Sequence, residues 1–508
     1  MRPTYLGFET SKSALYASQK ALDITGNNLA NISSEGYTRQ RVAQVSSNYH
    51  NFASKEYIGG RVALAGQGTT ILGIAQTRDA QVDNAFRQQC AEIGETSQRS
   101  AMLTEIEDAL QEYDIGTDGD GYGLRNAVAD LYKALQDFSM DSSSPTYATV
   151  AADAFVRLEE TINEMYGDLE AVSDKYKAAL NTDCTNVNKC LEKIAILNKD
   201  IREAMVVNQY TEEYGPNELL DERNMILDEL SAYGEVAVKY NYDGTVDVSL
   251  GGHLAVKGEI SDSLSYLENT DGTVEIAWKN TGEPAITGQG ILNASVDILN
   301  GRGTEMQNST ETSAKGILYY KDKLNKFALH LADVCNTTIP QEIDEYGNVM
   351  SYKQLFGAYV ENSNGVSDVY NDMYITAENI SISNELNESV NYLFFDGGGN
   401  TDNTYLLNLI ARLSDSDVSF GDFTGTFEEY IADYATGLGS DLSYANERNE
   451  AATVVGNSLN NTRESIMGVS ETEETTNMLA YNRAFQAAAK MMNMMDSMLD
   501  VIINQMGV

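Results

Sequence analysis

The stretch that decides the fold is Asn477–Met506, which reads NMLAYNRAFQAAAKMMNMMDSMLDVIINQM. An apolar side chain recurs every seven residues in this stretch, and a second apolar position follows three residues after each of them. Ser470 and Glu473 fit a capping box just before the first turn. The spacing therefore predicts a capped coiled-coil helix. Its seam consists of Met478, Tyr481, Phe485, Ala488, Met492, Met495, Leu499, Ile502 and Met506.

The N-terminal end carries a matching heptad stripe, with small or polar side chains in most of its second positions. The large positions of this stripe are Phe8, Leu15, Leu22 and Leu29, and Ile32 closes it. Amphipathic helices of this kind often pack on the core of their own domain. Two narrow stripes at opposite ends of one chain favour instead a paired terminal coiled coil formed by residues 1–45 and 470–508. Helices that bury each other only partly are marginal alone, so we expect them to be poorly ordered until neighbouring copies cover them.

The middle of the chain is mostly helical in pattern, and the whole chain has only 5 prolines, none of them in its last 168 residues. Apolar residues from Phe155 to Ile201 step by three and four, which predicts one helix over about 146–210 with a length of about 98 Å. Shorter series predict helices over about 78–112, 124–138, 317–334 and 427–469. Together these predict an elongated helical domain built from residues 46–235, 315–338 and 422–469.

Two segments break the helical pattern. In the first, residues 236–314, apolar residues alternate around the turn pairs Asp243-Gly244 and Asp271-Gly272, which predicts two β-hairpins. The second, residues 339–421, has no regular helical spacing and is predicted to be a further inserted β or mixed domain. The predicted fold class is thus mainly α with inserted β domains, arranged as an elongated multidomain rod.

The net charge of −42 disfavours binding to nucleic acid or to anionic membranes. This charge is uneven, because residues 1–100 carry 10 basic and 8 acidic side chains, a net of +2, and the remaining residues therefore carry −44. No apolar run exceeds four residues, which argues against membrane insertion and against a cleaved secretory signal. We expect a water-soluble chain.

The sequence offers little for catalysis or metal binding. The common zinc, phosphate-loop, dinucleotide and serine-hydrolase motifs do not occur. The acidic run from Asp114 to Gly121 imitates a calcium loop, but Gly116 and Ala127 stand where the first and last ligands belong. His330 lies beside an apolar helical face and is expected to pack there. The four cysteines are expected to be buried thiols. We therefore predict no enzyme activity, no cofactor and no metal.

Short motifs near both ends resemble the bacterial flagellar axial proteins of the rod, hook and hook-associated group. Residues 28–31 read NLAN, residues 36–40 read GYTRQ, and residues 473–490 read EETTNMLAYNRAFQAAAK. Within this group, residues 217–224 (NELLDERN) and the segment from Gly316 are similar to the FlgK-type hook–filament junction family. The N-terminal motif residues are Asn28, Ala30, Asn31, Gly36, Tyr37, Thr38, Arg39 and Gln40.

This resemblance implies a structural component of the bacterial flagellum in which a ring of copies connects the hook to the filament. It implies contacts with the hook protein and with a second, FlgL-type junction protein. It also implies an extracellular location, reached by export through the flagellar type III apparatus without signal cleavage, with a FlgN-type chaperone on the C-terminal helix. Residues 340–420 match no family motif, and the arginine that often follows the proline of the long helix is missing after Pro145.

Three alternatives remain open at this point. The chain could be a hook or distal rod subunit, which immunolocalisation along the hook rather than at its tip would support. An adhesin-like module could reside in the inserted β domains, which glycan or surface binding by residues 236–420 would support. A surface hydrolase is the weakest alternative, because the sequence offers no activated nucleophile and no metal site.

Overall fold

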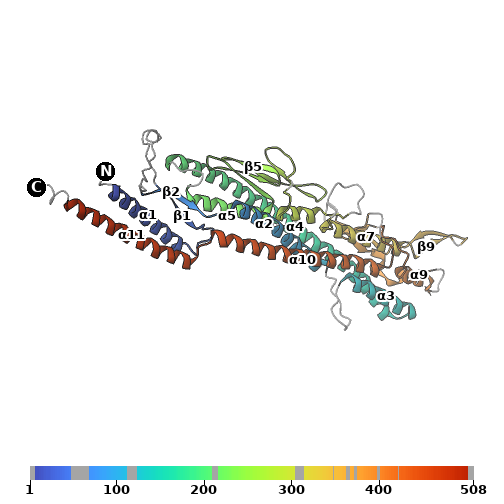
Figure 1. The fold of residues 1–508 in the computed structure, drawn as a ribbon. Coiled ribbons are helices and arrows are strands. Elements are labelled where there is room, and N and C mark those ends of the chain that lie inside the picture. Colours follow the sequence, from blue (N-terminus) through green and yellow to red (C-terminus); the bar gives the residue numbers. More distant parts are fainter. Residues whose placement is uncertain are drawn as a thin grey trace.

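The computed structural model describes residues 6–46, 68–110, 123–208, 215–285, 287–303, 314–346, 348–361, 367–370, 374–396, 401–421 and 423–501. They form an elongated, mainly helical molecule (Figure 1). The first and last described residues lie at one tip, the long helices run along the body, and α9 (Thr404–Leu413) and β9 (Pro340–Ile343) lie toward the far tip. The mainly α, elongated fold class predicted from the sequence is confirmed.

The terminal helices α1 (Leu6–Ala30) and α11 (Glu471–Asp500) pack side by side and run antiparallel (Figure 1). Their direction follows from two contacts, since Gly7 lies against Met495 at one end and Asn28 contacts Glu474 at the other. An antiparallel ribbon of β1 (Gln40–Ser46) and β2 (Thr69–Gln76) packs beside α1. We call α1 and α11 the terminal helix pair.

The body is a bundle around α4 (Pro145–Asn208), a single helix of 64 residues and about 96 Å. Its apolar series from Phe155 to Ile201 is almost completely buried, which confirms the long helix predicted over 146–210. The helices that accompany it are α2 (Ala80–Leu110), α3 (Leu124–Met140), α5 (Asn217–Tyr233), α6 (Ile291–Asn300), α7 (Ile317–Asn336) and α10 (Phe427–Met467).

The first inserted β segment contains the two predicted hairpins. One sheet has the order β3 (Val236–Tyr240), β4 (Val246–Leu250), β5 (His253–Lys257) and β6 (Ile260–Ser261), and a second pairs β7 (Leu264–Glu268) with β8 (Val274–Trp278). In each predicted turn an aspartate side chain accepts hydrogen bonds from the backbone and hydroxyl of the threonine two residues later. The intervening glycines, Gly244 and Gly272, have φ values of 83° and 81°, which glycine adopts without strain.

Helical asparagines fix the strands onto the body. The Asn300 side chain donates to the Val274 carbonyl at 2.7 Å and accepts from the Val274 N–H at 2.8 Å. Asn198 pairs in the same way with Val246, at 2.8 and 3.0 Å. Asn188 and Asn336 make equivalent pairs with Leu264 and Phe356. Each amide thus replaces a missing strand neighbour and satisfies both backbone groups of one residue.

The second inserted segment is mixed, with short sheets and helices. Its three-stranded sheet has the order β12, β11, β13, and two-stranded ribbons pair β9 with β10 and β14 with β15. Its elements are β9 (Pro340–Ile343), β10 (Val349–Tyr352), β11 (Phe356–Glu361), β12 (Ser367–Tyr370), β13 (Ile380–Ile382), α8 (Asn384–Glu388), η2 (Val390–Leu393), β14 (Phe395–Asp396), β15 (Thr401–Asp402) and α9 (Thr404–Leu413). The domain boundaries proposed from the sequence stay predictions.

Several local predictions can be compared with the structure. Cys184, Cys190 and Cys335 are buried free thiols as expected, whereas Cys90 is only half-buried. His330 packs edge-on against Phe420, with ring centroids 5.1 Å apart. The acidic run that imitates a calcium loop, from Asp114 to Gly121, lies within residues 111–122, which are outside the described residues. Among the residues that the structure describes, no helix is long and apolar enough to cross a membrane.

Candidate assembly site

The predicted seam residues lie along the terminal helix pair, but most of them are only half-buried. Ala488 is buried, while Phe8, Leu15, Leu22, Leu29, Met478, Tyr481, Phe485, Met492, Met495 and Leu499 are half-buried. Ile32 lies beyond the end of α1 and is 44% exposed, so it does not extend the seam within this chain. Ile502 and Met506 lie outside the described residues.

The centre of the α1 contact is made by small side chains rather than by the large heptad positions. Ala17, Ala21, Ser11, Ser18 and Thr25 are all buried. Small side chains bring two helix backbones close together, and the larger seam side chains then lie along the edges of the contact. The thin second row seen in the sequence is therefore more deeply buried than the large heptad positions.

A second apolar face on α11 points away from α1. We call it the outward stripe, and its side chains are between 42% and 59% exposed. The sequence analysis did not identify it, although the last four of its residues step by three, four and three. The stripe consists of Leu479, Met491, Met494 and Met498 on α11, and of Val501 directly after its last residue.

The family-motif residues form a polar joint at the base of the terminal helix pair. Buried Asn28 donates to the Gln40 carbonyl at 2.8 Å and to the Glu474 carboxylate at 3.1 Å. Its Oδ1 accepts from the Gln40 N–H at 3.0 Å and from the Tyr37 hydroxyl at 2.9 Å. Burial, reinforced by nearby carboxylates, raises the pKa of Tyr37 to about 12, which keeps this hydroxyl a donor. Asn28 therefore ties α1, the loop after it and α11 together.

The other motif residues shape the loop that leaves α1. Asn31 donates to the Asn27 carbonyl at 3.0 Å and so closes the last turn, while Ala30 is exposed. Gly36 has a φ of 76°, and a Cβ there would lie 3.3 Å from the Met225 sulfur of α5. Glycine suits this position on both grounds.

Arg39 joins the start of α11 to the N-terminal segment. Its guanidinium forms ion pairs of 2.8 Å with Glu473 and with the buried Glu474, and its N–H donates to the Met467 carbonyl at 2.9 Å. Ser470 caps α11 by accepting from the Glu473 N–H at 3.5 Å. Because the Glu473 carboxylate binds Arg39, the reciprocal half of the predicted capping box is not formed, and that part of the prediction is wrong.

Thr38 connects the joint to the body. Its hydroxyl donates to Asp221 of α5 at 2.5 Å, and its N–H donates to the same carboxylate at 3.2 Å. Gln76 of β2 donates to Asp221 at 2.9 Å, and Arg78 donates to the Thr38 hydroxyl at 3.2 Å. Burial raises the pKa of Asp221, although the bonds from Thr38 oppose that shift. One carboxylate thus gathers donors from two segments of the N-terminal region.

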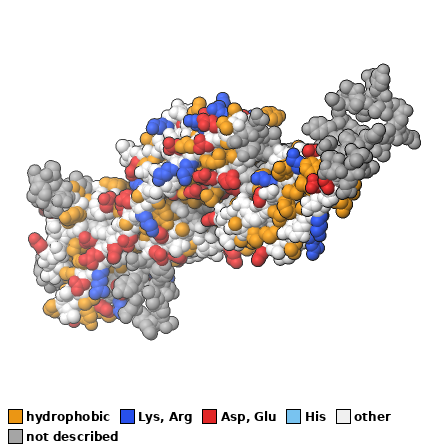
Figure 2. Space-filling model, turned by 90° about the vertical axis from the view of Figure 1, so that its left-hand side faces the viewer, with side chains coloured by type: hydrophobic (Ala, Val, Ile, Leu, Met, Phe, Trp, Pro, Cys, Tyr) orange, Lys and Arg blue, Asp and Glu red, His pale blue; other side chains and the backbone are white. Residues whose placement is uncertain are grey.

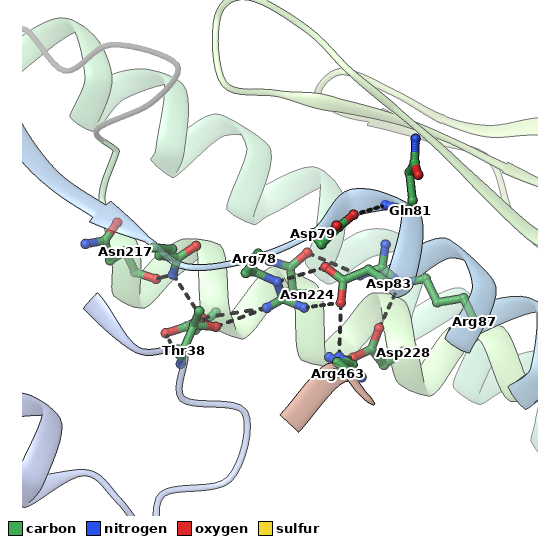
Figure 3. Close-up of polar contacts among 12 residues, drawn as sticks. Thr38, Arg78, Asp79, Gln81, Asp83, Arg87, Asn217, Asn224, Asp228 and Arg463 are labelled. Atoms are coloured by element: carbon green, nitrogen blue, oxygen red, sulfur yellow. Dashed lines mark hydrogen bonds and ion pairs between the residues drawn. The ribbon is translucent and has the colours of Figure 1, made fainter. Parts of the chain in front are cut away.

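Ion pairs continue from this joint into the body, as Figure 3 shows. Arg78 binds Asp83 at 3.0 Å, Asp83 also binds Arg463 of α10 at 3.0 Å, and Arg463 binds Asp228 of α5. The fully buried Arg87 of α2 binds Asp228 at 2.7 Å. These contacts link α2, α5 and α10, so the terminal helix pair is attached to the bundle through polar side chains on several elements.

The surface of the described residues is mixed in character. No group of three or more histidine, cysteine or acidic side chains in the described ranges could hold a metal ion. Acidic and basic side chains are interspersed with hydrophobic ones on the face shown in Figure 2. The terminal helix pair thus exposes the apolar outward stripe, and the polar contacts of the joint attach it to the long helical body.

Comparisons with known proteins agree with this architecture. The family model "Flagellar hook-associated protein FlgK helical domain" matches residues 103–356, half of the chain. The ends match two further models, "Flagella basal body rod protein" at residues 8–38 and "Flagellar basal body rod FlgEFG protein C-terminal" at residues 464–506. The first of these ranges covers α1 from Phe8 onward and the motif loop as far as Thr38, and the second contains α11.

Relatives are found over the whole length of the chain. Flagellar hook-associated protein 1 of Bacillus subtilis is 28% identical over 100% of this chain and 99% of its own. The protein of the same name from Escherichia coli is 25% identical over 53% of this chain and 49% of its own. The solved flagellar hook junction protein FlgK of Burkholderia pseudomallei matches with a TM-score of 0.56 at 12% identity, covering 76% of this chain and 100% of that structure, which supports the fold. The chain belongs to the FlgK family of flagellar hook-associated proteins.

Proposed function

We propose that this chain is a non-enzymatic structural protein that assembles as a ring of copies and joins the flagellar hook to the filament. The family and the full-length relative named hook-associated protein 1 support the junction role. The single observation that carries the assembly mechanism is the outward stripe, because α11 pairs with α1 and the stripe still exposes five large apolar side chains.

A ring needs two different surfaces on each copy, since one patch must meet a different patch of the next copy. The outward stripe supplies one of them. Exposed Tyr16 on α1 and the half-buried seam side chains along the edges of the pair are candidates for the other. The apolar area that a neighbour removes from water would favour association and offset the ordering of the contact residues.

The remaining partners follow from the same proposal. The hook protein would bind one side of the ring, and a FlgL-type junction protein would bind the other side. A FlgN-type chaperone would bind α11 before export through the type III apparatus without signal cleavage, and the assembled protein would be extracellular. The C-terminal region is rich in methionine, since 7 of the 17 methionines fall in residues 478–508. Methionine side chains adapt to different partners, which supports the proposal that this region binds more than one protein.

Deletion of residues 471–508 tests the assembly mechanism. The remaining chain should keep its helical circular dichroism, because the bundle around α4 does not include α11. Attachment to isolated hooks, followed by immunogold labelling, should be lost. Undiminished labelling of hook tips by the shortened chain would contradict the proposal.

A further inference from the structure

A cavity lies between the joint and the first β segment, away from the terminal helix pair. Its volume is about 290 Å³, just below the usual range for small-molecule sites. The start of α2, helix α5, the end of α4 and the β3–β4 turn contribute its walls. Arg78, Asp83 and Asn224, which Figure 3 labels, are among the lining residues.

Arg223 is the unusual residue of this cavity. It is 2% exposed, and its Nη1 donates to the Asn198 side chain at 3.1 Å and to the Gly244 carbonyl at 2.7 Å. Its Nε is buried without a hydrogen-bond partner. Among the residues that the structure describes, no carboxylate forms an ion pair with it. Burial lowers the pKa of Arg223 to about 10, so the side chain is still charged at neutral pH.

A buried charge without a counter-ion is costly, and proteins normally pair it. The other charges in the wall do not supply that pairing, because Asp83 already binds both Arg78 and Arg463. Among the described lining residues, Arg78, Arg223 and Asp83 give a formal charge of +1. This positive balance contrasts with the net charge of −42 of the whole chain.

We propose that this cavity binds a small carboxylate through Arg223. Arg223 lines the cavity, its Nη1 already donates to Asn198 and Gly244, and a guanidinium with a donor to spare binds a carboxylate through charge-assisted hydrogen bonds. Asn224 supplies a further polar group in the wall. Apolar side chains, among them Met205, Pro216 and Leu220, surround the remaining space and suit a short aliphatic body.

Titration of the full chain with sodium butyrate tests the proposal, with sodium chloride at equal ionic strength as the reference. Calorimetry should show saturable binding, and the melting temperature should rise with butyrate. Arg223→Gln should weaken binding by about tenfold or more, because it removes a charged hydrogen-bond donor. Ala80→Trp, a change at an exposed residue of the cavity wall, should weaken binding without touching Arg223. Arg448→Gln, on α10, is the matched control and should bind as wild type.

The source of the carboxylate is tested separately by hook attachment. If Arg223→Gln attaches like wild type, the ligand is a free small molecule. If attachment is lost, and butyrate also inhibits attachment of the wild type, the ligand is an acidic side chain of another protein copy. The attachment result assigns the source of the carboxylate, and the butyrate titration decides whether Arg223 binds one.

Two results would overturn the proposal. The first is no difference between butyrate and chloride in the wild type. The second is wild-type affinity in both Arg223→Gln and Ala80→Trp.

Discussion

Asp221 is the residue through which the N-terminal segment meets the body, and its two oxygens accept from Thr38 and Gln76. Its folded-state pKa is raised above 3.8, mainly by burial. The folded protein therefore holds this proton more tightly than the unfolded chain does. The stabilisation that comes with that proton is present at low pH and is lost as the pH rises from about 3.8 through the folded-state pKa.

Asp221→Asn removes this titration. We expect the stability advantage of the wild type over the variant, measured by urea unfolding, to shrink as the pH is raised through that window. The same titration with Asp130→Asn, at an exposed position on α3, serves as the control and should not reproduce the trend. An advantage that stays constant or grows with pH would contradict the role of burial at Asp221.

Asn300 gives a second prediction at the scale of a residue. Its amide satisfies both backbone groups of Val274, so Asn300→Ala leaves a buried N–H and a buried carbonyl without that partner. We expect a loss of about 2–4 kcal/mol in the free energy of unfolding. Asn293→Ala on the same helix should cost much less, because that amide has one long contact of 3.4 Å with Asp297. Equal losses in the two variants would rule out the anchoring role.

At the scale of elements, the approach of α2 to α5 depends on a glycine. A Cβ on Gly94 would lie 2.3 Å from the Ala232 carbonyl oxygen, and backbone cannot move aside as easily as a flexible side chain. Gly94→Ala should therefore destabilise the protein by about 1–3 kcal/mol. Gly167 on α4 has open space around it, so Gly167→Ala should stabilise the long helix by about 0.5–1 kcal/mol. In thermal unfolding, the melting temperature should be lower than wild type for Gly94→Ala and higher than wild type for Gly167→Ala.

The elements also show what the sequence could predict. The 64 residues of α4 and the two hairpins were predictable, because periodicity and Asp-Gly turns are local signals. The contacts of the joint were not, since Thr38 and Asp221 are 183 residues apart and Arg39 and Glu474 are 435 apart. Family resemblance identified Asn28, Thr38 and Arg39 without showing what they bind. The outward stripe was missed although its spacing was readable, because the adjacent heptad positions gave the stronger pattern.

At the scale of the whole molecule, the two ends of the chain form one assembly unit on a long body. The terminal helix pair is held by polar contacts at its base, while the faces along its length remain apolar and accessible. This division lets the base fix the direction of the pair while the outward stripe is free to contact a neighbour. The central claim is that this stripe is the surface through which copies associate.

The most direct measurement of that claim is attachment of a stripe variant to isolated hooks, counted as labelled tips by electron microscopy. Met494→Asp with Met498→Asp places two charges on the stripe of α11, and Val454→Asp with Val455→Asp makes the same change at exposed apolar positions on α10. Both variants should keep wild-type circular dichroism. The account predicts that the α11 variant loses tip labelling and the α10 variant retains it. Wild-type labelling by the α11 variant would contradict the account.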